Sequence, residues 1–290
     1  SKRWLDQARE QLNGYEKTKG GLEELASWHG EALILYAEMN DFERAEFHAE
    51  EAIKLKKEYG DSLGLATSYI NAGHVFVLLG FFEKAIKFYN KGLNTYPTGE
   101  LARNTSAGKA RALGGISQVW IQSKEYDRAR SYINEELKIF KSIGQDEGVA
   151  GAFMRLAISY IKEDTARADS ALYYLSKAKK IYAVLGNRRR YASAQLNTGG
   201  VYVMAGEYEK ALTQLDSAEI IIDAVSFESD KQELKSFMGQ SYLRLGNLDL
   251  AEYYLTEALT LFKQSKDIYG IKSTYDYLAE VYFEQDQFEK

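Results

Sequence analysis

The stretch Gly206-Glu207-Tyr208-Glu209-Lys210-Ala211 decides the fold, because its pattern recurs along the chain. The pattern is a glycine, any residue, an aromatic residue or leucine, two further residues and an alanine. It returns at residues 80–85 and 246–251, and with the glycine replaced at residues 40–45 and 124–129. A block that recurs in this way indicates an array of similar units.

The alanine that closes each block marks the period of the array. Consecutive marker alanines are 40, 44, 42, 40 and 40 residues apart, at Ala45, Ala85, Ala129, Ala171, Ala211 and Ala251. A nearly fixed period in this range is typical of a solenoid, in which each repeat buries its apolar face against its neighbours.

Each period contains two helical patterns separated by a turn. In the fifth period, Leu196 and Gly199 belong to one apolar stripe, and Ala211 and Leu215 belong to another. Both stripes follow the three-and-four spacing of an α-helix. Gly206 lies between them, where a residue without Cβ can take the left-handed conformation that ends a helix. One repeat is therefore predicted to be a helical hairpin.

These hairpins resemble tetratricopeptide repeats, which have a small residue at the eighth position, aromatic residues at the eleventh and seventeenth, and alanine at the twentieth. Three repeats match best. The second has Gly73, Phe76, Phe82, Ala85 and Pro97 at the family's positions. The fifth has Gly199, Tyr202, Tyr208 and Ala211, and the sixth has Gly239, Tyr242 and Ala251. The resemblance implies an all-α fold, a right-handed superhelical solenoid of helical hairpins. The alternative is a bundle of unrelated amphipathic helices.

The period of about forty residues exceeds the usual 34 of this family, so we expect longer helices. This long variant resembles the arrays of spindle-orientation adaptors, bacterial peptide-pheromone receptors and sensor segments of bacterial signalling proteins. In the first repeat, Leu33 stands where a small residue belongs, which predicts poorer helix packing. The polar segment 94–107 predicts a loop insertion, and the fourth repeat needs two extra residues in its turn before Ala171.

We expect a single solenoid over residues 1–290. The full repeats are predicted at 22–60, 62–97, 107–144, 147–186, 188–226 and 230–267, with the second helix of a truncated repeat at 1–20 and a truncated last repeat at 270–290.

Both ends have the pattern of interrupted repeats, which predicts that the chain is cut from a longer array. Ala8, Leu12 and Tyr15 have the spacing of a second helix without a first helix before it. In the last repeat the covering helix is missing, so we expect Tyr275, Leu278 and Tyr282 to lose their cover. The final helix should then either fray or be buried against another copy of the chain.

The composition excludes several classes of protein. The chain has 290 residues, 45% of them hydrophobic, a net charge of -5 and no cysteine. Disulfides, thiolate metal sites and cysteine nucleophiles are therefore excluded, and a general nucleic-acid binder is not favoured. No apolar run approaches the roughly 20 residues that span a bilayer. The composition fits the cytoplasm, or the periplasm if the chain is part of a bacterial sensor.

No constellation of catalytic residues emerges. His29, His48 and His74 form no metal-binding pair of the His-Glu-x-x-His type. Gly108-Lys109 lacks both the preceding glycine and the following Ser or Thr of a phosphate loop. We therefore expect no enzyme, no cofactor and no metal.

The resemblance implies a ligand groove along the first helices, whose second, fifth, sixth, ninth, twelfth and thirteenth positions face it. Asn71 and Asn197, at sixth positions, resemble the asparagines that bond the backbone of an extended peptide in this family, and His74 stands at a ninth position. The predicted peptide-binding residues are Asn71, His74, Arg111, Gln118, Gln122, Arg155, Lys162, Asn197, Gln240 and Arg244. The alternative is that these polar residues only solvate the concave face.

The groove departs from the family's clamp for a C-terminal carboxylate, because Gly30 and Ile34 stand where that clamp has lysine and asparagine. The predicted groove has amide and guanidinium donors between apolar walls of Ile158, Ile161, Val203 and Leu243. It suits an acidic or amphipathic segment of a protein.

Two functions follow from the sequence. The first is a scaffold that binds proteins or peptides. The alternative is the sensory or regulatory segment of a larger signalling protein, such as a histidine kinase or a transcription regulator. Neither involves nucleic acid or a membrane within this chain.

Overall fold

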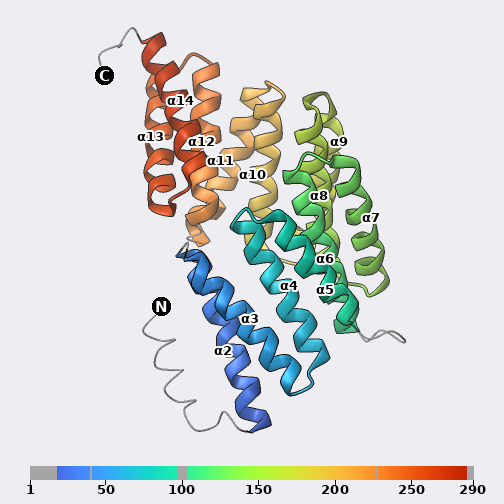
Figure 1. The fold of residues 1–290 in the computed structure, drawn as a ribbon. Helices are drawn as coiled ribbons and strands as arrows, with labels where there is room; N and C mark the ends of the chain where they lie inside the picture. The colour runs from blue at the N-terminus through green and yellow to red at the C-terminus, as the bar shows by residue number, and fades with distance from the viewer. Residues whose placement is uncertain (1–17, 40, 97–102, 226–227, 286–290) are drawn as a thin grey trace. The chain divides into compact units, whose positions relative to one another are not determined.

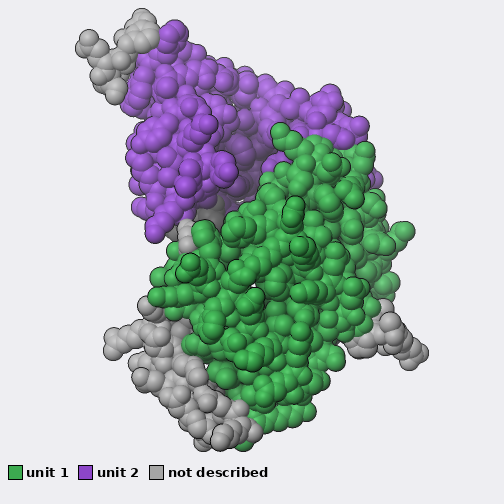
Figure 2. Space-filling model, viewed as in Figure 1, with its two compact units in different colours: residues 1–148 green, residues 149–290 purple. Residues whose placement is uncertain are grey.

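The computed structural model describes residues 18–39, 41–96, 103–225 and 228–285 (Figure 1). These residues form thirteen α-helices and one short 3-10 helix, and no β-strand occurs among them. The predicted all-α class is confirmed. The chain divides into two compact units, residues 1–148 and 149–290 (Figure 2).

In the first unit the helices alternate between the first and second members of hairpins. They are α2 (Lys19–Glu38), α3 (Phe42–Glu58), α4 (Ser62–Leu78), α5 (Phe82–Thr95), α6 (Arg103–Gln122) and α7 (Tyr126–Ser142). The pairs α2–α3, α4–α5 and α6–α7 pack together.

The second unit continues the alternation. Its elements are α8 (Asp146–Glu163, which begins just before the boundary), η1 (Thr165–Arg167), α9 (Ala168–Val184), α10 (Arg188–Met204), α11 (Tyr208–Val225), α12 (Glu228–Arg244), α13 (Leu248–Ser265) and α14 (Ile268–Glu284). Whether the predicted repeats form a single solenoid over residues 1–290 stays a prediction.

Left-handed residues end most helices. The backbone φ lies between 61° and 79° at Gly60, Gly80, Gly144, Gly186, Gly206 and Gly246. Lys124, where the sequence pattern has lost its glycine, keeps this conformation with a φ of 62°. Asn40, the other replaced glycine, lies outside the described residues. The turn is therefore a property of the repeat, and glycine is the residue that adopts it at least cost.

Small side chains bring the two helices of a hairpin together. All six marker alanines have an exposed fraction of 0%. A Cβ at Gly199 would lie 2.5 Å from Leu215 Cδ2, and one at Gly239 would lie 2.6 Å from Leu255 Cγ. The close approach predicted at the eighth and twentieth positions is confirmed.

The expectation of poor packing in the first repeat is wrong. Leu33 is buried, in one cluster with Ala37, Ala45 and Ala49. These small alanine side chains leave room for the larger leucine, so α2 and α3 still pack closely.

The loop predicted over residues 94–107 is shorter than expected. Helix α5 continues to Thr95 and α6 begins at Arg103, with Thr105 buried in it. Residues 97–102 lie outside the described part. In the fourth repeat, the extra residues of the turn form η1. The backbone N–H of Ala166 in η1 donates a hydrogen bond of 2.9 Å to the Asp164 side chain.

The expectation for the last helix is partly wrong. Leu278 is buried in a cluster with Leu243 and Leu255, because this face of α14 packs on α12 and α13. The Tyr282 hydroxyl donates to Glu252 at 2.9 Å. Only Tyr275 is half exposed, at 49%. The second helix predicted from Ala8, Leu12 and Tyr15 lies outside the described residues.

Within each unit the first helices form one layer. Helix α4 contacts both α2 and α6 in the first unit, and α12 contacts both α10 and α14 in the second. Among the described residues, no comparable contact joins α3 to α5 or α11 to α13. The second helices therefore splay apart, and the first helices make the inner layer of each unit.

The close approach predicts opposite effects for one substitution at two helical glycines. Gly30→Ala should stabilise the protein by about 0.5–1 kcal/mol, because its Cβ meets nothing within 4 Å and alanine favours the helix. Gly239→Ala should destabilise it by about 1–2 kcal/mol, since the Cβ would overlap Leu255. Urea unfolding followed by circular dichroism measures both. Equal stability of the two variants would contradict the role assigned to the small eighth residue.

Candidate functional site

All ten predicted peptide-binding residues lie on first helices. Asn71 and His74 are on α4; Arg111, Gln118 and Gln122 on α6; Arg155 and Lys162 on α8; Asn197 on α10; and Gln240 and Arg244 on α12. Five therefore lie on first helices of the first unit and five on first helices of the second. Their role in binding stays a prediction.

In the first unit, this face combines half-buried amides with exposed polar groups. Asn71 and Gln118 are half-buried, whereas His74, Arg111 and Gln122 are exposed. The His74 ring is fixed by a hydrogen bond of 2.8 Å between its Nδ1 and the Tyr89 hydroxyl. Burial raises the pKa of Tyr89, so this hydroxyl stays neutral.

In the second unit, several of the predicted groups already have partners. The Asn197 amide Nδ2 donates to the Ser193 carbonyl at 2.8 Å, and Gln240 Nε2 donates to Ser236 Oγ at 3.1 Å. Arg244 forms a two-pronged ion pair with Glu280 of α14, one prong of which is 3.1 Å long. A ligand must compete for these groups or use their remaining acceptors.

The predicted apolar walls are wrong for three of their four residues. Ile161, Val203 and Leu243 are buried, because each packs in a cluster with residues of the second helix of its own hairpin. Ile158 is half-buried. First helices expose other apolar side chains, among them Ile34 at 48%, Leu78 at 79% and Met204 at 44%, at ninth and thirteenth positions.

Two carboxylates of α12 were missed by the sequence reasoning. Asp230 accepts a hydrogen bond of 2.6 Å from Ser193 Oγ. Desolvation and then repulsion by Asp230 raise the pKa of Glu233, while Lys162 lowers it and Asp267 raises it. Glu233 stands at a second position, so the repeat register could have identified it. These carboxylates make the inner layer mixed in charge rather than basic.

The three histidines do not form a metal centre. His29 and His48 are buried, with their Nδ1 atoms 2.9 Å apart in a hydrogen bond between α2 and α3. Burial and then the charge of Arg44 lower the pKa of His48. In the described residues, no group of three or more His, Cys, Asp or Glu side chains is arranged to hold a metal ion.

Comparison with known proteins identifies the repeat. The sequence model of the tetratricopeptide repeat matches residues 23–98 and again residues 233–265. Protein KINESIN LIGHT CHAIN-RELATED 2 of Arabidopsis thaliana is 26% identical over 68% of this chain and 29% of its own length. The chain spans between 29% and 38% of the length of the three curated relatives it matches.

Solved structures share the fold at low sequence identity. Aspartyl phosphate phosphatase F from Bacillus subtilis has a TM-score of 0.75 at 11% identity, over 95% of this chain and 70% of that chain. NprR in complex with its cognate peptide NprX has a TM-score of 0.59 at 17% identity, over 91% and 74%.

A third structure, from Pyrococcus horikoshii, is a Signal Transduction ATPase with Numerous Domains that has a tetratricopeptide repeat sensor. Its TM-score is 0.61 at 16% identity, over 93% of this chain and 41% of that chain. At these identities the three structures show the fold alone. Among the residues described for this chain, we find no helix with the length and apolar character of a membrane span.

The raised pKa of Glu233 predicts a pH-dependent gain in stability on removing its charge. A carboxyl whose folded-state pKa is raised adds stability below its ordinary pKa and loses it as the pH rises through the folded value. The Glu233 side chain is exposed and solvent screens its charge, so Glu233→Gln should raise the melting temperature at pH 7 only slightly, and this gain should shrink towards pH 4. Glu135→Gln, at a carboxylate of α7, is the control. A gain of the same size at both pH values would show that the charge is not the cause.

Proposed function

The chain belongs to the tetratricopeptide-repeat family, and we propose that it is a protein-binding scaffold that holds a segment of another polypeptide against an inner layer of first helices. Proteins of this family are generally not enzymes. The proposal accordingly assigns no catalytic residue and no cofactor to the chain.

One observation carries this proposal: successive first helices of the second unit present groups suited to a peptide backbone and its charges. Arg155, Asn197 and Gln240 come from α8, α10 and α12, at sixth and ninth positions. An amide can donate to and accept from a peptide unit, and a guanidinium can bind a carboxylate through two hydrogen bonds. Because Asp230 and Glu233 share this layer, an amphipathic segment with charges of both signs fits it best.

The structural relatives support the same function. NprR shares the fold over most of this chain and is described in complex with its cognate peptide. In this chain, the exposed Met204 of α10 offers an apolar contact beside the polar groups of the layer.

The proposal predicts that Arg155 and Asn197 contribute to peptide affinity without being needed for the fold. A random dodecamer library displayed on phage would be selected on the immobilised chain, and selected peptides would be titrated against Arg155→Ala/Asn197→Ala. We expect losses of about 1–3 kcal/mol for each hydrogen-bonding group removed. Fluorescence anisotropy measures the affinities.

The control removes a cation and an amide from a second helix, through Lys138→Ala/Asn134→Ala on α7, where both side chains are exposed. It should keep the parent affinity. Failure to select any peptide, or unchanged affinity of Arg155→Ala/Asn197→Ala with unchanged helicity, would count against the inner layer as the binding surface.

The second candidate function is a sensory or regulatory segment of a larger signalling protein. The observation that favours it is the repeat sensor of the Pyrococcus horikoshii protein, where the shared fold covers 41% of a longer chain. The two candidates are compatible. A peptide that changes the activity of a domain attached in the full-length protein would establish the second.

A further inference from the structure

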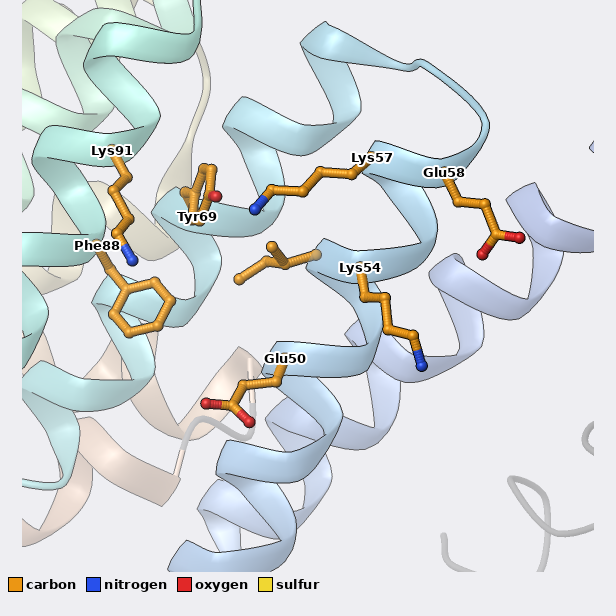
Figure 3. Close-up of a pocket in the computed structure, with 8 residues that line it drawn as sticks. Glu50, Lys54, Lys57, Glu58, Tyr69, Phe88 and Lys91 are labelled. Atoms are coloured by element: carbon orange, nitrogen blue, oxygen red, sulfur yellow. The ribbon is translucent and has the colours of Figure 1, made fainter.

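A hollow opens on the outer side of the first unit, where the second helices α3 and α5 splay apart. Figure 3 shows this hollow, with Lys57 and Glu50 from α3, Lys91 and Phe88 from α5, and Tyr69 from α4 between the two helices. Its volume is about 480 Å³. A neighbouring hollow of about 710 Å³ shares Glu50, Phe88 and Lys91 with it and extends along α5. Together they make one surface, which we call the α3–α5 groove.

The helical period places an apolar residue and a lysine side by side on each wall of the groove. On α3, Ile53 lies four residues before Lys57, and on α5, Phe88 lies three residues before Lys91. Residues at these spacings share a helix face. Ile53, Phe88 and Tyr69 are buried, while both lysines are exposed. The groove therefore has an apolar floor and a cationic rim.

The two lysines point into the groove over its aromatic rings. Lys57 Nζ lies 5.9 Å and Lys91 Nζ lies 5.8 Å from the centroid of the Tyr69 ring, and Lys91 Nζ is also 5.3 Å from that of Phe88. Figure 3 shows both ammonium groups directed at this floor, whereas Lys54 and Glu58 point away. Within the described part of the chain, neither Lys57 nor Lys91 has a carboxylate within ion-pair distance.

The equivalent gap in the second unit, between α11 and α13, is bridged by the protein's own charges. Lys235, four residues before Gly239, takes the place that Tyr69 has before Gly73. Its ammonium lies 2.7 Å from Glu219 of α11 and 3.0 Å from Glu257 of α13. A cation at the floor is thus held between carboxylates from both walls.

In the α3–α5 groove this charge arrangement is reversed. Lys91 occupies the place of Glu257, since each is the sixth residue after its marker alanine. Ile53 occupies the place of Glu219, since each is the eighth residue after its marker alanine, and Lys57 lies four residues further along α3. The cations are now on the walls and the floor is a neutral aromatic ring. The α3–α5 groove therefore lacks the carboxylates that bridge the other gap.

We propose that the α3–α5 groove is a second binding surface, which takes an acidic segment of a partner protein. Carboxylates of the segment pair with Lys57 and Lys91, and an adjacent apolar side chain packs on Ile53, Tyr69 and Phe88. Glu50 and Glu83 also line the groove and would repel a continuous phosphate backbone, so a protein segment with separated charges fits better than nucleic acid. This surface is independent of the inner layer.

The test uses the intact chain and a random dodecamer library on phage. Phage that bind the chain are passed over Lys57→Gln/Lys91→Gln, and those that this variant does not retain are sequenced. We expect peptides in which Asp or Glu neighbours an aromatic or aliphatic residue. In fluorescence anisotropy their affinity should fall about tenfold or more for this variant, and should also weaken as NaCl rises from about 0.05 to about 0.3 M.

Lys138→Gln/Lys180→Gln is the matched control, because it removes two exposed lysines of α7 and α9 that do not line the groove, and it should keep the parent affinity. Arg155→Ala/Asn197→Ala should bind these peptides normally, which separates this surface from the inner layer. Circular dichroism confirms the fold of each variant. The proposal is overturned if no acidic peptide is enriched or if Lys57→Gln/Lys91→Gln binds as well as the parent. Tighter lysine-dependent binding of a single-stranded oligonucleotide or of phosphatidylserine vesicles would also overturn it.

Discussion

The architecture depends on the contact between two helices at one small residue. Each marker alanine is completely buried, and in the second, fifth and sixth repeats the glycine at the eighth position leaves no room for a Cβ. The two backbones approach closely at this contact, so the larger side chains around it must pack into the remaining space. This packing fixes the angle between the two helices. The repeated choice of alanine thus sets the geometry of one hairpin after another, and the turn residues only have to connect the helices.

This geometry gives each unit two different surfaces. First helices pack on each other and form a continuous inner layer, while second helices splay and leave gaps. The residue at the fourth position of the repeat, on the first helix, lies under such a gap, so its identity decides what the gap becomes. Lys235 draws in carboxylates from both sides, whereas Tyr69 offers a ring that the lysines of the walls cover. One scaffold position therefore produces either a closed ion cluster or an open hollow.

Much of the fold was accessible from the sequence, because local chemistry determines it. The marker alanines, the helical stripes and the turns follow from the repeat, including the turn at Lys124. The hydrogen bonds and ion pairs of the candidate site were harder to predict from the sequence. The pairing of Arg244 with Glu280 joins residues from successive first helices, and the Asn197 bond to Ser193 depends on a side-chain rotamer. Comparing fourth positions between repeats would have revealed the contrast between Tyr69 and Lys235.

Lys124 has a consequence for the order in which the array assembles. A residue with a Cβ in the left-handed conformation costs about 1–2 kcal/mol that glycine largely avoids. The α6–α7 hairpin therefore starts from a less favourable intrinsic free energy than α10–α11, whose turn contains Gly206. In a linear array, such a hairpin is stabilised by coupling to its neighbours. We expect the α6–α7 hairpin to fold after α4 and α5 and to pack on them. Folding of the array should therefore propagate through this hairpin rather than start there.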